Sequence, residues 1–132
     1  MIKLAKEKGI ETGTFIMLGY PGETISDIRE TIKHLQDCQP DQFTVNLAYP
    51  IKGTKLYEEV GHEFENRIDW PLPVDKDFDF RRTYKRKFYN YAIRKVYNEV
   101  YYLRNRMEGN YLKAMKHKAK AWAATIVMFL LK

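Results

Sequence analysis

Cysteine is almost absent from this 132-residue chain, which contains only Cys38. A single thiol forms no intramolecular disulfide and cannot supply a four-cysteine zinc or iron–sulfur site. Long apolar runs are also scarce: the main one, residues 121–131, has 11 residues and is too short to cross a bilayer. The N-terminal residues mix charged and apolar side chains, so we expect no secretory signal and a cytoplasmic protein.

Charge divides the chain into two unlike parts. Residues 1–80 contain nine Lys and Arg against fifteen Asp and Glu, whereas residues 81–120 contain thirteen against two. The change follows Pro71 and Pro73, which disfavour helix. We therefore expect three segments: a first unit over residues 1–60, a linker over 61–80 and a basic, tyrosine-rich helical extension over 81–132.

The first unit has the pattern of two strands joined by a helix. Residues 14–18 form an apolar run too short for a helix, which favours a strand buried on both faces. Thr24 and Asp27 have the spacing of a capping box that begins a helix. The apolar stripe expected on this helix consists of Ile28, Ile32 and Leu35, extended by Cys38.

Residues 43–49 alternate large apolar side chains with small or polar ones, which predicts a second strand. We expect Phe43, Val45, Leu47 and Tyr49 to face the helices and Thr44, Asn46 and Ala48 to face the other side. Strand, helix and strand in so short a stretch predict a βαβ unit with parallel strands. Two strands alone leave unpaired edges, so the unit is predicted to be a piece of a larger α/β architecture.

Two glycine-containing loops, residues 19–24 and 50–54, follow these strands and lead into helix N-termini, with Thr54 expected to cap the second of these helices. Ligands in α/β proteins bind at such strand ends, and free backbone N–H groups there can hold an anion or a ribose. The first loop has no lysine of the kind that a phosphate loop requires. Taken alone, the glycines are better explained as residues of tight turns.

Two motifs within residues 9–58 change that interpretation. The segment GYPGET at 19–24 and the segment YPIKGTKLY at 49–57 resemble the G-[FLY]-P-G-[EQ]-T turn and the Y-P-x-x-G-T-x-L-Y segment of radical S-adenosylmethionine (radical SAM) enzymes, where they follow the fifth and sixth strands. The resemblance implies a TIM-like partial (β/α)6 barrel followed by an α-helical extension. Lys52 departs from the pattern, because many relatives have proline there.

The resemblance also implies a cofactor site, in which the adenine of S-adenosylmethionine contacts the strand ends. Position by position, it assigns four cofactor-binding residues: Met17, Gly19, Ala48 and Tyr49. It assigns no catalytic residue and no metal ligand in this chain.

In the family, a C-x-x-x-C-x-x-C motif holds a [4Fe–4S] cluster whose electron cleaves S-adenosylmethionine to a 5′-deoxyadenosyl radical. This chain lacks the motif. We therefore expect the C-terminal portion of a radical SAM oxidoreductase or transferase, present as a separate fragment or as a truncated reading frame. Such a fragment is inactive alone, has the N-terminal half of the barrel as its partner, and acts with it on a small-molecule substrate that the sequence does not identify.

The extension is predicted to form two helices, over residues 81–107 and from Tyr111 onward. The apolar stripe expected on the first consists of Tyr89, Ile93, Val96, Val100, Leu103 and Met107. The stripe expected on the second consists of Leu112, Met115, Ala119, Trp122, Ile126 and Leu130. The extension resembles those of cobalamin-binding-domain radical SAM proteins, which implies cobalamin as a further cofactor.

The composition of the extension suggests three kinds of partner: nucleic acid, a membrane surface, or the rest of the protein. Its aromatic and basic side chains are of the kinds that stack on bases and neutralise phosphates, but packing and a solvated surface explain them better, which argues against nucleic acid. The lysines of residues 113–120, followed by the apolar residues 121–131, suit either a peripheral membrane contact or a helix docked as a lid. The alternative function is accordingly a non-catalytic protein that binds a membrane surface or nucleic acid.

Overall fold

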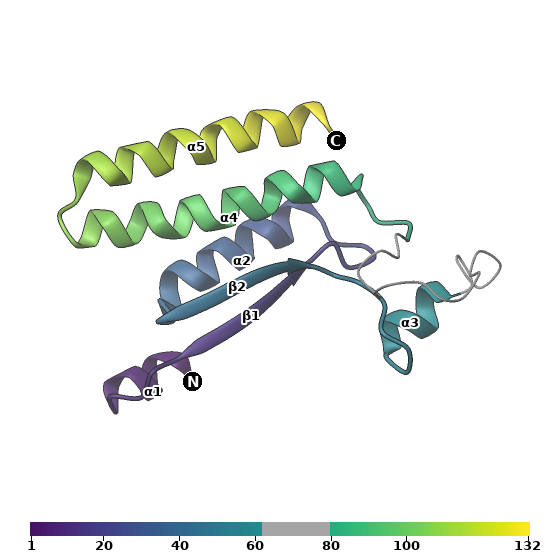
Figure 1. Cartoon of the computed structure of the whole chain (residues 1–132), viewed down its shortest axis with the longest axis horizontal. Helices are drawn as coiled ribbons and strands as arrows, with labels where there is room; N and C mark the ends of the chain where they lie inside the picture. The colour runs from purple at the N-terminus through teal and green to yellow at the C-terminus, as the bar shows by residue number, and fades with distance from the viewer. Residues whose placement is uncertain (62–79) are drawn as a thin grey trace, which may run out of the picture.

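The computed structural model describes residues 1–61 and 80–132, so most of the linker predicted over 61–80 lies outside the described residues. The elements follow in this order: α1 (Ile2–Glu7), β1 (Gly13–Leu18), α2 (Ile25–Cys38), β2 (Gln42–Leu47), α3 (Lys55–Val60), α4 (Arg86–Met107) and α5 (Tyr111–Leu130). The sheet forms one side of the molecule, α2 and α4 lie over it, and α5 lies outermost on α4 (Figure 1).

The two strands pair in parallel, in a register that runs from Gly13 opposite Gln42 to Leu18 opposite Leu47. Helix α2 connects them, so the predicted βαβ unit is confirmed. Within residues 1–61 and 80–132 these two strands make up the whole sheet. The partial barrel stays a prediction.

The core lies between the sheet and the two helices above it. The predicted stripe of α2 is confirmed, since Ile28, Ile32 and Leu35 are buried, and Cys38 at its end is half-buried. They pack with residues from the strands and from α4: Leu18, Val45, Phe88, Tyr89, Ala92, Val96 and Val100. Burial of this apolar surface attaches the extension to the βαβ unit.

One face of the sheet is uncovered, which corrects the prediction that the first strand is buried on both faces. Leu18 is fully buried on the helical side, but Phe15 is 82% exposed and Met17 is 53% exposed on the other. Side chains alternate along a strand, and α2 and α4 both cover the same face. No element of the described chain packs over Phe15 and Met17.

Helix α4 begins at Arg86 rather than at residue 81, and ends at Met107, shortly before Gly109 with its φ of 76°. Part of its predicted stripe is confirmed, because Tyr89, Val96 and Val100 are buried. Met107 is 68% exposed, so the stripe does not continue to the end of the helix.

Helix α5 packs through a different face from the one predicted. Its buried residues are Ala114, Ala121, Ala124 and Met128. The predicted stripe points outward instead, and Leu112, Trp122 and Leu130 on it are 90%, 67% and 76% exposed. Alanine lets helix axes approach closely, so the alanine face fits against α4 better than the face with bulky side chains. In the described part of the chain, no helix has the length and hydropathy needed to cross a membrane.

Candidate functional site

The turn after β1 is built around two glycines with left-handed backbone conformations. Gly19 has φ 85° and Gly22 has φ 82°, values that L-residues with a side chain rarely adopt. The N–H of Gly19 donates a 2.7 Å hydrogen bond to Oε2 of Glu23. Burial raises the pKa of Glu23, while the Gly19 N–H acts to lower it. Glu23 therefore stabilises the turn of its own motif, and the N–H of Gly19 already has a hydrogen-bond partner.

The helix that follows this turn is capped by its own side chains. The Thr24 side chain accepts from the Asp27 N–H, and Asp27 Oδ2 accepts from the Thr24 N–H at 2.7 Å, so the predicted capping box is confirmed. These contacts, first the backbone N–H and then the hydroxyl of Thr24, lower the pKa of Asp27. The anion site considered for this loop gains no support from the geometry, because donors at this helix N-terminus already have partners.

The second loop is also stabilised by hydrogen bonds between its own residues. Thr54 caps α3 as predicted, by accepting from the N–H of Tyr57, and its hydroxyl donates to the carbonyl of Ile51 at 2.7 Å. Both motif threonines thus begin helices. Turn and cap formation explains the glycines and threonines of the two segments locally, so any ligand must be bound by the remaining groups at the strand ends.

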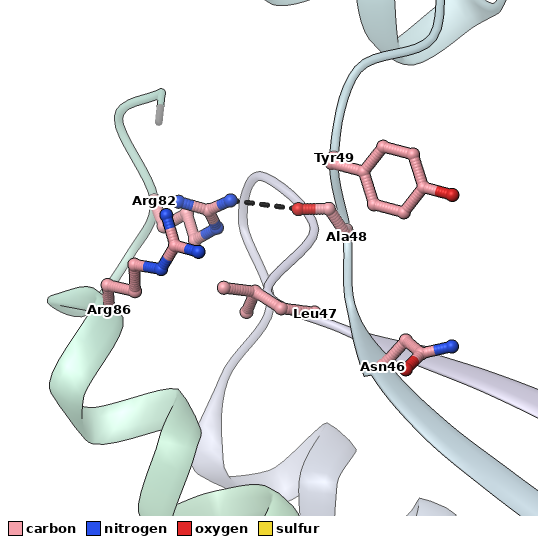
Figure 2. Close-up of a pocket in the computed structure, with 6 residues that line it drawn as sticks. All are labelled: Asn46, Leu47, Ala48, Tyr49, Arg82 and Arg86. Atoms are coloured by element: carbon pink, nitrogen blue, oxygen red, sulfur yellow. Dashed lines mark hydrogen bonds between the residues drawn. The ribbon is translucent and has the colours of Figure 1, made fainter. Parts of the chain in front are cut away.

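The two strand ends lie side by side and are held by an arginine from the extension. The N–H of Ala48 donates to the carbonyl of Leu18 at 2.7 Å, which places Ala48 beside Gly19. Nη2 of Arg82 donates to the carbonyl of Ala48 at 2.8 Å (Figure 2). A Cβ atom added to Gly19 would lie 2.8 Å from Cδ1 of Leu47 and 3.1 Å from Cδ of Arg82. The extension therefore packs directly against the predicted site.

A cavity of about 150 Å³ lies at this point. Its lining consists of Asn46, Leu47, Ala48, Tyr49, Arg82 and Arg86. Leu47 and both arginines lie on one side of the chain, while Asn46 and Tyr49 point to the other (Figure 2). The guanidinium of Arg82 also lies over the ring of Phe80, 3.9 Å from its centroid.

The four predicted site residues fall into two groups. Met17 pairs with Asn46 on the uncovered face. Half-buried Tyr49 points to the same side as Asn46, so the prediction that it faces the helices with Leu47 is wrong. Gly19 and Ala48 lie at the edge toward Arg82. Ala48 was predicted to lie with Asn46 on the face away from the helices. It is fully buried instead, in a second cluster with Leu56 and Val60 of α3 and with Phe80.

The cavity at the strand ends is too small to enclose a cofactor. Pockets that enclose a small molecule have volumes of about 300–1,000 Å³, well above the volume of this cavity. Among the residues described, no three His, Cys, Asp or Glu side chains are grouped so as to hold a metal ion. Cys38 lies on α2 beside His34, with its Sγ 3.8 Å from the ring nitrogens. A [4Fe–4S] cluster therefore does not fit the described side chains.

Sequence reasoning missed Arg82 and Arg86 as site residues and treated them as surface charge. Arg82 lies 34 positions from Ala48 along the chain, so only tertiary packing brings the two together. The one local signal is the Phe80-Arg81-Arg82 run a few residues before α4, and that run alone does not indicate a contact with the strand ends.

Comparison with known proteins finds partial relatives. No family model matches the chain, and no solved structure matches it. The ribosomal protein uS12 methylthiotransferase RimO of Leptospira biflexa is 37% identical over 46 residues, which is 35% of this chain and 10% of that protein. The threonylcarbamoyladenosine tRNA methylthiotransferase of Homo sapiens is 38% identical over 56 residues, 41% of this chain and 10% of that protein.

A third relative matches over a longer region. The tRNA-2-methylthio-N(6)-dimethylallyladenosine synthase of Sulfurihydrogenibium is 27% identical over 96 residues, 68% of this chain and 22% of that protein. These proteins are radical SAM enzymes, so short and distant homology connects the chain with that class. The matched regions cover about a tenth to a fifth of the relatives' length. The cobalamin-binding type implied by the extension receives no support from these relatives.

Proposed function

We propose that the chain forms the part of a radical SAM barrel around the fifth and sixth strands and supplies one wall of the S-adenosylmethionine site. One observation carries the proposal: the sheet face opposite α2 is uncovered, and the apolar side chains of β1 are exposed on it next to the two motif loops. Phe15 and Met17 on this face are 82% and 53% exposed. A parallel strand pair with one bare face and no further strand in the described chain is expected to bind more of a sheet.

The arrangement agrees with the geometry of a (β/α) barrel. In such barrels helices cover the outside of the sheet, and side chains on the inner face pack together or bind ligands near the C-terminal ends of the strands. Helix α2 covers the buried face, so the bare face corresponds to the inside. Met17 lies on it one residue before the end of β1, which suits contact with an adenine ring.

Within this proposal, the chain depends on a second polypeptide segment that carries the cluster cysteines. The names of the relatives assign methylthio transfer to ribosomal protein uS12 or to tRNA adenosines. Methylthio transfer is therefore the first reaction to assay once the site is complete.

The test combines the chain with the polypeptide encoded immediately upstream of it, in frame or adjacent. After anaerobic reconstitution, the combination is expected to contain about four irons per protein and to release 5′-deoxyadenosine from S-adenosylmethionine, whereas the chain alone does neither. An upstream polypeptide without a C-x-x-x-C-x-x-C segment, or a combination that binds a cluster without cleaving S-adenosylmethionine, contradicts the proposal.

A matched pair of variants locates the site in the active combination. Met17→Ala is expected to weaken S-adenosylmethionine binding several-fold, equivalent to about 1 kcal/mol, from lost sulfur and apolar contacts. Met107→Ala removes the same kind of side chain from an exposed position on α4, away from the bare sheet face, and is the control, with affinity unchanged. Equal effects of the two variants would remove Met17 from the site.

A further inference from the structure

Helix α5 presents an apolar surface to solvent along its outer side. The residues of this outer stripe are Leu112, Met115, Ala119, Trp122, Ile126 and Phe129. Their spacing of three and four residues places them on one face of the helix, opposite the alanines that contact α4. Part of the stripe is hollowed into a shallow groove of about 460 Å³ around Trp122 and Ile126.

Basic side chains flank this stripe. Helix α5 has four lysines and no acidic residue. Lys118 is held by Glu99 of α4 at 2.9 Å, whereas Lys113, Lys116 and Lys120 are exposed. Lys120 also lies near Arg94 of α4, with which it lines another groove. An apolar stripe bordered by exposed lysines is typical of a helix that lies in the surface of an anionic bilayer.

A second copy of the chain is a poorer occupant. Twenty residues make a helix about 30 Å long and about 10 Å wide, so the stripe offers about 300 Å² of contact. A stable dimer buries about 800 Å² on each partner. Pairing two stripes would also bring two sets of lysines together. The rest of a barrel is no better, since the bare sheet face lies on the opposite side of the molecule from α5 (Figure 1).

We propose that α5 docks side-on, through the outer stripe, onto a membrane surface that contains anionic lipid. Trp122 and the apolar neighbours enter the interface, while Lys113, Lys116 and Lys120 extend toward the headgroups. Docking does not depend on the radical SAM proposal, because no residue of the strand ends takes part in it.

The test is co-sedimentation of the full chain with vesicles of phosphatidylcholine alone or with about 30% phosphatidylglycerol. Binding is expected only to the anionic vesicles, and it should fall steeply between about 0.1 M and 1 M salt, as the screening length shortens from about 10 Å to 3 Å. In a Trp70→Phe background, Trp122 is the single tryptophan, and its emission should shift to the blue on binding.

Two sets of variants separate the apolar and electrostatic contributions. Replacing Lys113, Lys116 and Lys120 with Gln should weaken partitioning about 100-fold, at about 1 kcal/mol per lysine. The same replacement at Lys3, Lys8 and Lys52 changes the net charge equally on exposed sites outside α5 and should have little effect. Trp122→Ala should weaken partitioning about tenfold, whereas Phe15→Ala should leave it unchanged.

Three results overturn the proposal. One is equal binding to neutral and anionic vesicles, and another is equal loss in the two lysine sets. The third is concentration-dependent dimerisation that Trp122→Ala abolishes, in a chain that no vesicle recruits. Circular dichroism of each variant confirms that its helices are intact, so that a loss of binding reports on the surface.

Discussion

The molecule leaves two apolar faces uncovered, and they differ in kind. The sheet face around Phe15 and Met17 is uncharged and belongs to strands whose outer edges have no strand partner in the described chain. The outer stripe of α5 belongs to a helix whose backbone bonds are internal, and lysines border it. A sheet edge needs hydrogen-bond partners, so its natural cover is more protein. A helix whose backbone hydrogen bonds are all internal needs only apolar surroundings for its exposed side chains, and the lysines favour an anionic surface.

Helix α4 separates the two faces, and the comparison depends on its core. Val96 is fully buried there, while Phe129 on the outer stripe is 76% exposed. Val96→Asp should reduce the free energy of unfolding by at least about 4 kcal/mol, because it buries an unpaired charge. Phe129→Asp should change it by no more than about 0.5 kcal/mol. Urea unfolding followed by circular dichroism measures both, and comparable losses would show that the outer stripe is covered in solution.

The next largest effect is expected where α5 meets α4. Ala121 is fully buried in that contact, and Ala119 lies exposed on the outer stripe two residues earlier. Ala121→Leu should destabilise the chain by about 1–3 kcal/mol through overpacking. Ala119→Leu adds the same atoms in the same helix and should be nearly neutral. If the order of the two effects is reversed, α5 packs through the stripe that the sequence suggested.

Local interactions account for what the sequence predicted well. The Thr24–Asp27 box, the Thr54 cap and the stripe of α2 are formed by residues three or four positions apart, so their spacing alone indicates them. The parallel strand pair followed from the same local reasoning, because so short a crossover leaves few alternatives.

The failures share one physical cause, which is that periodicity identifies a face but not its neighbour. Helix α5 has a bulky stripe and an alanine face, and only the close approach of α4 decides which one is buried. The contact of Arg82 with Ala48 crosses 34 residues and has no local signature. The exposure of Phe15 depends on what covers the sheet, and the composition of a strand does not contain that information. The four predicted cofactor residues remain a prediction.

A smaller effect is expected at the strand ends, where the site adjoins the helical side. Gly19 and Gly22 both have positive φ, but only at Gly19 would a Cβ meet other atoms, 2.8 Å from Leu47 and 3.1 Å from Arg82. Gly22→Ala should cost about 1 kcal/mol from backbone strain alone. Gly19→Ala should cost about 1 kcal/mol more, and Arg82→Ala should relieve part of that excess. Thermal melts of Gly22→Ala, Gly19→Ala, Arg82→Ala and the Gly19→Ala/Arg82→Ala double variant measure these costs in stability. Equal costs at both glycines would contradict the close packing of Arg82.

The smallest effect depends on pH and concerns the other end of the sheet. Oδ2 of Asp41 accepts hydrogen bonds from the hydroxyl and the N–H of Thr12, at 2.7 and 2.8 Å, and Oδ1 lies 3.2 Å from Nζ of Lys6. The Thr12 contacts, followed by Lys6, lower the pKa of Asp41 from 3.8 to about 2. Because the pKa in the folded state is depressed, this carboxylate stabilises the sheet fully above its pKa in the unfolded chain and loses that effect as pH falls from about 4 toward 2.

Asp41→Asn should therefore flatten the decline of stability between about pH 4 and pH 2, measured by urea unfolding at a series of pH values. Asp37→Asn, which removes an exposed carboxylate of α2, controls for the loss of charge alone. If Asp41→Asn declines as steeply as the original chain, the strand starts are held by other contacts.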